Sequence, residues 1–253
     1  MNQDTKKIIN KVEQVTGYRV SVGSDTGFSG QALMITASPQ QPVHSITVNQ
    51  KYSNIGDYIV AMQCAMILVK WSDPENIPDF AVKDNKVSHQ IDKYSKDRKL
   101  EKFPPDKTHQ FVKSIVMGLM HQLISQPVEM IAMDICREEC PGLKDIMETS
   151  INNTILALHQ NLDPKIRQIT PTDLFEKNNA MNAALALNWV RMSENEHLLV
   201  PFKTVGILDK GKELLKIFDS VPVSDKQRYT KTVDGWADKL QLSSLYTWKY
   251  RNA

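Results

Sequence analysis

The apolar positions of the first fifty residues change from a helical to a strand-like spacing. Between Ile8 and Val15, apolar residues recur every three or four positions, which predicts an amphipathic helix over residues 3–16. Gly17 follows directly and is a typical C-terminal stop for such a helix. We therefore expect one short helix before the first strand.

Three short segments rich in Val, Ile, Thr and Leu come next, separated by Gly, Asp, Ser and Pro. They predict strands over residues 18–22, 29–37 and 43–48. The first two are joined across residues 23–27 and are expected to form a hairpin. No strand is expected after Asn49, so the sheet should be small.

Helical spacing dominates the rest of the chain. An almost uniformly apolar helix is expected over residues 52–71, with Ser53 or Asn54 as its N-cap. Further helical patterns cover residues 107–124, 126–140, 142–160, 171–193, 204–219 and 224–240. Pro127 suits the first turn of a helix, so a new helix is expected to begin there.

Residues 72–107 have a different character, because four prolines interrupt many charged side chains. This segment is predicted to be a long surface excursion with one short helix near residues 86–95. The whole pattern predicts an α+β fold that is mainly α, with a three-stranded sheet packed on a long buried helix and followed by a helical bundle. Residues 1–162 are expected to form one domain, and residues 163–253 a C-terminal helical extension that packs either separately or continuously with it.

Composition and charge exclude some classes of protein. The 253 residues are 41% hydrophobic and 24% charged, as in ordinary globular proteins. The net charge of +2 gives little general attraction to nucleic acid or to anionic lipid. Three cysteines are too few for a disulfide scaffold, and the longest uncharged apolar run, residues 58–69, is too short for a bilayer. With no signal-peptide pattern at the N-terminus, a cytoplasmic protein without membrane contact is expected.

Two windows of the sequence carry a resemblance to a known family. The first, residues 43–71, joins the last strand to the apolar helix that contains Ala61-Met-Gln-Cys-Ala-Met66, and the second, residues 126–150, opens with Gln-Pro-Val-Glu129. Together they resemble the minigluzincins and the related ImmA/IrrE-type zinc peptidases. In that family an edge strand precedes a helix bearing Ala-His-Glu-x-Gly-His, and a later helix supplies a third metal ligand. The resemblance implies a zincin-like domain built around the apolar helix.

The residues that carry the zinc chemistry of that family are replaced in this chain. Two histidines four apart on a helix can share a zinc ion, and the glutamate beside them serves as general base. Here Met62 and Met66 stand at the histidine positions, Gln63 at the glutamate position and Met133 at the third-ligand position. Thioethers are poor zinc ligands, and an amide does not accept a proton near neutral pH. The resemblance therefore implies an inactive site that holds no metal and no cofactor.

A simpler interpretation stands beside this one. A helix that is apolar all round is usually a buried core helix, and methionine is a common core residue. Copper(I) accepts soft thioether ligands, but that alternative has less support than core packing. Cys136 and Cys140 are four apart on one predicted helix, and we expect two reduced thiols there, because that spacing suits a disulfide poorly.

The sequence thus predicts a peptidase-like protein that acts as a regulatory or protein-binding module, with another protein as its partner. The resemblance suggests a role in bacterial or phage regulation. One alternative is a metal-dependent hydrolase that uses Asp134, Glu129, His121 or His109 in a shifted register. A second alternative is a nucleic-acid-binding regulator, since basic and aromatic side chains alternate near the C-terminus.

Overall fold

The computed structural model describes residues 1–251, and it is mainly helical with two small sheets. This confirms the predicted α+β, mainly α fold class. The strands are β1 (Arg19–Asp25), β2 (Ala32–Ile35), β3 (Val43–Asn49), β4 (Ile77–Val82) and β5 (Tyr246–Arg251). The α-helices are α1 (Gln3–Thr16), α2 (Gly56–Lys70), α3 (Asp84–Tyr94), α4 (Pro105–Glu139), α5 (Lys144–Leu158), α6 (Pro164–Ile169), α7 (Thr172–Ser193), α8 (Val200–Thr204), α9 (Leu208–Ser220) and α10 (Arg228–Lys239).

The chain divides into two compact units that are not continuous in sequence. The first unit comprises Met1–Pro78, Val128–Ile151 and the chain from Tyr250, and the second comprises Asp79–Pro127 and Asn152–Lys249. The boundary expected at residue 162 therefore lies inside the second unit. Among residues 1–251, none of the helices combines the length and the apolar character that crossing a lipid bilayer requires.

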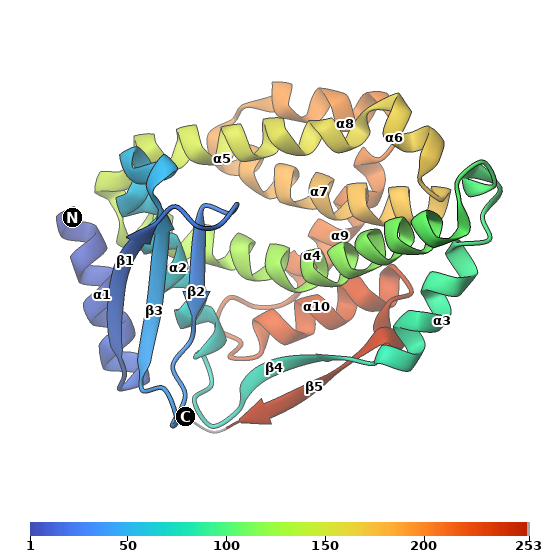
Figure 1. The fold of residues 1–253 in the computed structure, drawn as a ribbon. Coiled ribbons are helices and arrows are strands. Elements are labelled where there is room, and N and C mark those ends of the chain that lie inside the picture. Colours follow the sequence, from blue (N-terminus) through green and yellow to red (C-terminus); the bar gives the residue numbers. More distant parts are fainter. Residues whose placement is uncertain (252–253) are drawn as a thin grey trace. The chain divides into compact units, whose positions relative to one another are not determined.

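Helix α1 begins and ends where the sequence predicts. The side chain of Asn2 caps its first turn by accepting a hydrogen bond from the Asp4 N–H group (2.8 Å). Gly17 ends the helix in the left-handed conformation, with φ 72°, which glycine adopts without steric cost. α1 packs on α2 and on β1 (Figure 1). Its apolar residues Ile8 and Val12 are buried.

The three-stranded sheet has the order β1-β3-β2 (Figure 1). β1 runs parallel to β3, and β2 runs antiparallel to it. The predicted hairpin between the first two strands is therefore wrong, because they pair with opposite sides of β3. The alternate side chains His44, Ile46 and Val48 of β3 are all buried, which explains why this strand takes the centre of the sheet.

Helix α2 follows β3 through a short 3-10 helix, η1 (Gln50–Ile55). Both predicted N-cap residues, Ser53 and Asn54, lie inside η1, so that prediction is wrong. Asn49 caps η1 instead, since its side-chain oxygen accepts the Lys51 N–H at 3.1 Å. α2 itself is buried over most of its surface, as its composition predicts.

The segment 72–107 is not a surface excursion. It contains β4, which pairs with β5, so the expectation of no strand after residue 49 is also wrong. The short helix expected near residues 86–95 is present as α3, and its Val87 and Ile91 are buried. Leu100 is buried as well. Because these side chains belong to the core of the second unit, the segment is an integral part of the fold and not an exposed loop.

The two helices expected over residues 107–124 and 126–140 are one helix, α4, with Pro127 inside it. A proline in a helix interior removes one backbone hydrogen bond. Leu123 and Val128 are buried on either side of it, so side-chain burial offsets that loss. The first-turn position predicted for Pro127 is therefore wrong.

The C-terminal helices of the second unit match the sequence pattern closely. The patterns at residues 171–193, 204–219 and 224–240 correspond to α7, α9 and α10. α9 packs along α7, where Gly211 faces the backbone of Ala183. On α10, the buried Trp236 indole donates a hydrogen bond to the Leu214 carbonyl on α9 (2.8 Å). These contacts hold the three helices together.

Candidate functional site

The peptidase-like positions lie on α2 and on the C-terminal part of α4, both in the first unit. Met62 is buried on α2, and its Sδ atom lies 4.0 Å from the Cys136 Sγ atom on α4. Met133 is buried one turn before Cys136, and residues three apart share a face of a helix. Gln63 and Met66 are only half-buried. The structure thus brings Met62 to the face of α4 that carries Met133.

A single stripe of α4 meets this part of α2. Glu129, Met133 and Cys136 follow one another at spacings of three or four residues, so they lie along one side of α4, and Cys140 continues this stripe directly after the end of the helix. The stripe is made of one carboxyl group and three sulfur-bearing side chains. Such a surface is mostly apolar and soft, and it offers few of the charged or imidazole ligands that zinc prefers.

Two ionisable groups at the site have shifted pKa values. Burial alone raises the pKa of the Glu129 carboxyl group to about 7, although the residue as a whole is only half-buried. Tyr58, one turn before Met62 on α2, is buried, and its pKa is raised by burial and then by the neighbouring charges of Cys136 and Glu129. From the sequence, Glu129 is predicted only as an alternative metal ligand. Tyr58 is not predicted as a site residue, although it lies one turn before Met62 on the same helix.

The three cysteines are free and buried. Burial raises the pKa of Cys64 to about 12 and that of Cys140 to about 11, and it raises the pKa of Cys136 further. Thiols with such pKa values stay protonated at neutral pH and react slowly. They pack as small apolar side chains, in agreement with the expectation of reduced, structural cysteines.

The shifted-register metal site is not assembled. In the described part of the chain, residues 1–251, no group of three His, Cys, Asp or Glu side chains gathers closely enough to hold a metal ion. His121 is exposed, and His109 is exposed with its Nδ1 atom 3.8 Å from the Asp92 carboxylate. Glu129 and Asp134 are half-buried on α4.

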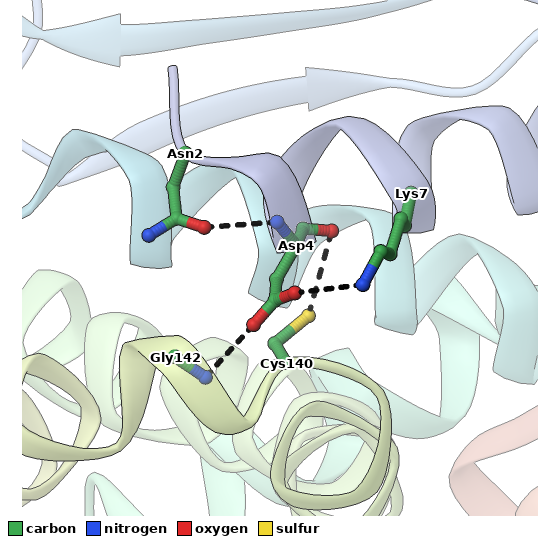
Figure 2. A network of polar contacts seen from close by, with 5 residues as sticks. All are labelled: Asn2, Asp4, Lys7, Cys140 and Gly142. Atoms are coloured by element: carbon green, nitrogen blue, oxygen red, sulfur yellow. Dashed lines mark hydrogen bonds and ion pairs between the residues drawn. The ribbon is translucent and has the colours of Figure 1, made fainter.

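A polar network surrounds Cys140, the residue directly after the end of α4 (Figure 2). The Asp4 carboxylate on α1 accepts the Gly142 N–H at 2.8 Å, and the Lys7 ammonium lies 3.3 Å from its other oxygen. The Cys140 thiol approaches the Asp4 carbonyl oxygen at 3.9 Å. The start of α1 is thereby joined to the connection between α4 and α5, which holds the sulfur-rich stripe in place.

The strand that precedes α2 carries a fully buried histidine. The Nδ1 atom of His44 accepts the Ala37 N–H at 3.0 Å, so the proton of the neutral ring belongs on Nε2, which lies 3.1 Å from the Thr16 hydroxyl. The Tyr18 and Trp71 rings meet His44 edge to face. Because both nitrogens are satisfied inside the core, His44 acts as a structural residue.

Strand β2 forms an open edge of the three-stranded sheet. Asn49 N–H donates to the Gln31 carbonyl at 2.8 Å, and the register then places the ladder bonds at Leu33 and Ile35. The N–H and C=O groups of Ala32 and Met34 consequently point away from β3, where residues 1–251 provide no backbone partner. The side chains of Leu33 and Ile35 are 52% and 44% exposed. They lie on the same face of the sheet as their partners Thr47 and Ser45 on β3.

The opposite edge of the same sheet is partly closed. On β1, the Val20 N–H donates to the Glu13 carboxylate at 2.9 Å, so a side chain of α1 occupies one of the edge donors. The edge residues of β1 are mostly polar, with Ser21 and Ser24 exposed. Polar edge residues and occupied donors discourage strand addition. Of the two edges, β2 thus carries the larger exposed apolar side chains, whereas one donor of β1 is already occupied.

Comparisons with known proteins return no relative. No family model matches the chain, and neither a curated protein nor a solved structure matches it. The strand before α2 is the central strand of the sheet, whereas the family pattern places an edge strand there. The resemblance over residues 43–71 and 126–150 accordingly rests on the sequence pattern alone.

Proposed function

We propose that this protein is a peptidase-like pseudoenzyme that acts by binding another protein, and that it binds an extended segment of its partner along β2. The open edge of β2 carries this proposal. An exposed strand edge offers a row of backbone donors and acceptors to an incoming strand, and the alternate side chains give specificity. Exposed Leu33 and Ile35 add apolar surface beside that edge.

The inactive half of the proposal is supported by the side chains on α2 and α4. Met62 and Met133 are buried thioethers where the family carries metal ligands, and Gln63 is an amide where the family carries its base. Apolar side chains are what a metal pocket should acquire once its ion is lost, because buried polar groups without partners are costly. Binding, rather than hydrolysis, is therefore the function that these residues favour.

A strand-edge variant tests the binding mode. The double substitution Leu33→Lys and Ile35→Lys places two charges at the edge of β2, where lysine opposes the approach of another strand. The probe is a library of phage-displayed decapeptides selected on the intact chain, and the affinities of the selected peptides are measured by fluorescence polarisation. We expect the double variant to weaken peptide binding by about tenfold or more.

The matched control lies on the other edge of the same sheet. Ser21 on β1 pairs with Ser45 of β3 from one side, as Ile35 pairs with it from the other, so the two side chains share one face. The substitution Ser21→Lys should leave peptide affinity unchanged. Equal affinities for the two variants, or a library that yields no binding peptide, would contradict binding at β2.

A second test restores the missing chemistry. The combined substitutions Met62→His, Gln63→Glu, Met66→His and Met133→Glu recreate a two-histidine, one-carboxylate ligand set with an adjacent base. If the alignment with the peptidase family is right, this variant should bind about one zinc ion per chain, measured by elemental analysis after dialysis. A restored variant that folds, by circular dichroism, but binds no zinc shows that these positions never formed a metal site.

The unmodified chain is the control for that measurement, and it distinguishes the alternative function. Glu129 carries the observation in favour of a hydrolase, since a half-buried carboxyl group with a pKa of about 7 suits general acid–base catalysis. One zinc ion per unmodified chain, lost on Glu129→Gln substitution, would favour the hydrolase over the pseudoenzyme.

A further inference from the structure

Two neighbouring hollows in the second unit share three residues. The larger encloses about 290 Å³ between α7, α9 and the end of α10, and the smaller lies between α3, α4 and α7. Asp173, Lys177 and Gln241 line both of them. A hollow of about 300 Å³ is at the small end of the range for ligand pockets, so its occupant would be a small molecule.

The largely buried side chain of Lys177 is the unusual feature of these hollows. Its side chain is only 11% exposed, and its Nζ atom lies 2.8 Å from an oxygen of the Asp173 carboxylate. The Tyr94 hydroxyl donates to the same carboxylate oxygen. Burial opposes ionisation of Asp173, but the hydrogen bonds from Lys177 and Tyr94 and the charges of Lys177 and Lys93 together lower its pKa.

Lys177 has donors to spare. An ammonium group carries three N–H donors, and Asp173 is the one hydrogen-bonding partner that residues 1–251 give it. Two donors of a largely buried cation are thus left to the hollows that it lines. Charged groups with little exposure are normally hydrogen-bonded in full, so an acceptor from outside the chain can pair with these donors, and a carboxylate makes the stronger, charge-assisted hydrogen bond.

The rest of the larger hollow carries balanced charge. Lys210 pairs with Glu176, and Lys239 pairs with Glu213 at 3.0 Å. With Asp173 and Lys177, the lining holds three cations and three carboxylates. The two outer pairs are exposed, and exposed ion pairs are weak enough to exchange partners with a ligand. A dianion would meet three carboxylates here, whereas a ligand with separated positive and negative groups meets both signs of charge.

We propose that this hollow binds a small zwitterion of the amino-acid class, with its carboxylate on the Lys177 ammonium group and its cationic group toward Glu176 and Glu213. Leu214 and Leu240 supply the apolar wall beside the ligand's carbon chain. This site lies entirely in the second unit and is independent of the function proposed for β2.

Three probes of equal carbon number test the assignment on the intact chain. 6-Aminohexanoate is the zwitterion, hexanoate has the carboxylate alone, and hexylamine has the ammonium group alone. Binding is measured by isothermal titration calorimetry up to about 10 mM probe, the range of weak small-ligand affinities. We expect 6-aminohexanoate to bind most tightly, hexanoate more weakly, and hexylamine not to bind.

Variants locate the binding. Lys177→Met keeps the apolar stem and removes the ammonium group, and it should weaken binding of 6-aminohexanoate by about tenfold or more. Because a buried substitution can disturb folding, Glu213→Gln provides a second variant at an exposed lining residue, where it removes a carboxylate that faces the ligand's cationic group. Lys212→Gln is its control on the same helix: Lys212 pairs with Asp209 and is absent from the lining.

Weakened binding of 6-aminohexanoate in Lys177→Met and Glu213→Gln, with normal binding in Lys212→Gln, supports the site. The proposal is overturned if no carboxylate probe binds, if hexylamine binds as tightly as the zwitterion, or if a folded Lys177→Met variant binds as the unmodified chain does.

Discussion

Replacing Gly211 with alanine is expected to lower the free energy of unfolding by about 3 kcal/mol. A Cβ atom at this position would lie 2.6 Å from the Cβ atom of Ala183, 2.9 Å from its carbonyl carbon and 3.0 Å from the Ala184 nitrogen. Two of these three neighbours are backbone atoms of α7, which cannot rotate away as a long side chain can. α9 would have to move away from α7, and the burial of Leu214 and Phe218 would suffer with it.

Gly118 provides the matched control for this prediction. It lies in the interior of α4, is exposed, and an added Cβ would meet nothing within 4 Å. Gly118→Ala should raise stability by about 1 kcal/mol, because alanine favours the helix by roughly that amount. Urea unfolding of both variants measures the two shifts. If Gly211→Ala were as stable as the unmodified chain, the close packing of α9 on α7 would be refuted.

Lowering the pH from 7 to 4 is expected to remove about 3 kcal/mol of stability through His44 alone. Burial, and then the charge of Arg251, lower the pKa of His44 from 6.5 to about 4. Between these two values, the unfolded chain binds a proton that the folded chain does not. The contribution is therefore fully present above pH 6.5 and is lost as the pH falls toward 4.

The measurement compares urea unfolding of the unmodified chain and of His44→Gln between pH 7 and pH 4. Glutamine keeps a hydrogen-bond acceptor and donor near Ala37 and Thr16 but does not titrate in this range. The pKa of Asp173 is lowered in the folded chain, so protonation of this carboxylate in acid destabilises both proteins alike. The difference between the two curves therefore isolates the contribution of His44. Two parallel curves would mean that His44 has the same pKa in the folded chain as in the unfolded chain.

Local signals predicted the helices well. The apolar repeat between Ile8 and Val15 and the stop at Gly17 give the bounds of α1, and the C-terminal patterns give α7, α9 and α10. Such signals lie within a few residues of the element that they specify. Such signals do not say which strands pair, so the predicted hairpin of the first two strands was wrong. The central strand is the one with buried side chains such as His44 and Ile46, and their burial depends on the packing of the whole unit.

Proline and charge gave wrong structural predictions for two segments of the chain. Pro127 was expected to start a helix, because its effect on one hydrogen bond is visible in the sequence and the burial of Leu123 and Val128 around it is not. The charged segment 72–107 was expected to lie on the surface. Its apolar residues Val87 and Ile91 lie one turn apart on α3, and Leu100 follows. All three are buried because other elements of the second unit cover them, and the local sequence does not show that cover.

The candidate sites were predictable to different degrees. The i,i+4 spacing of Met62 and Met66 singled out α2, and the structure places Cys136 of α4 beside Met62. Neither the raised pKa of Glu129 nor the spare donors of Lys177 can be read from the chain, because both depend on which helices surround them. Burial and pairing of ionisable groups are properties of the folded state.

The first unit is completed only by the last described residues of the chain. Arg251 donates to the Ala37 carbonyl at 3.3 Å and to the Thr36 hydroxyl at 3.2 Å, and it lies over the Trp71 ring. During synthesis, at about 5–20 residues per second, Thr36 and Trp71 would wait on the order of ten seconds or longer for this partner to emerge. The first unit therefore completes this packing only after the whole of the second unit has been synthesised, because residues 79–127 and 152–249 precede Arg251 in the chain.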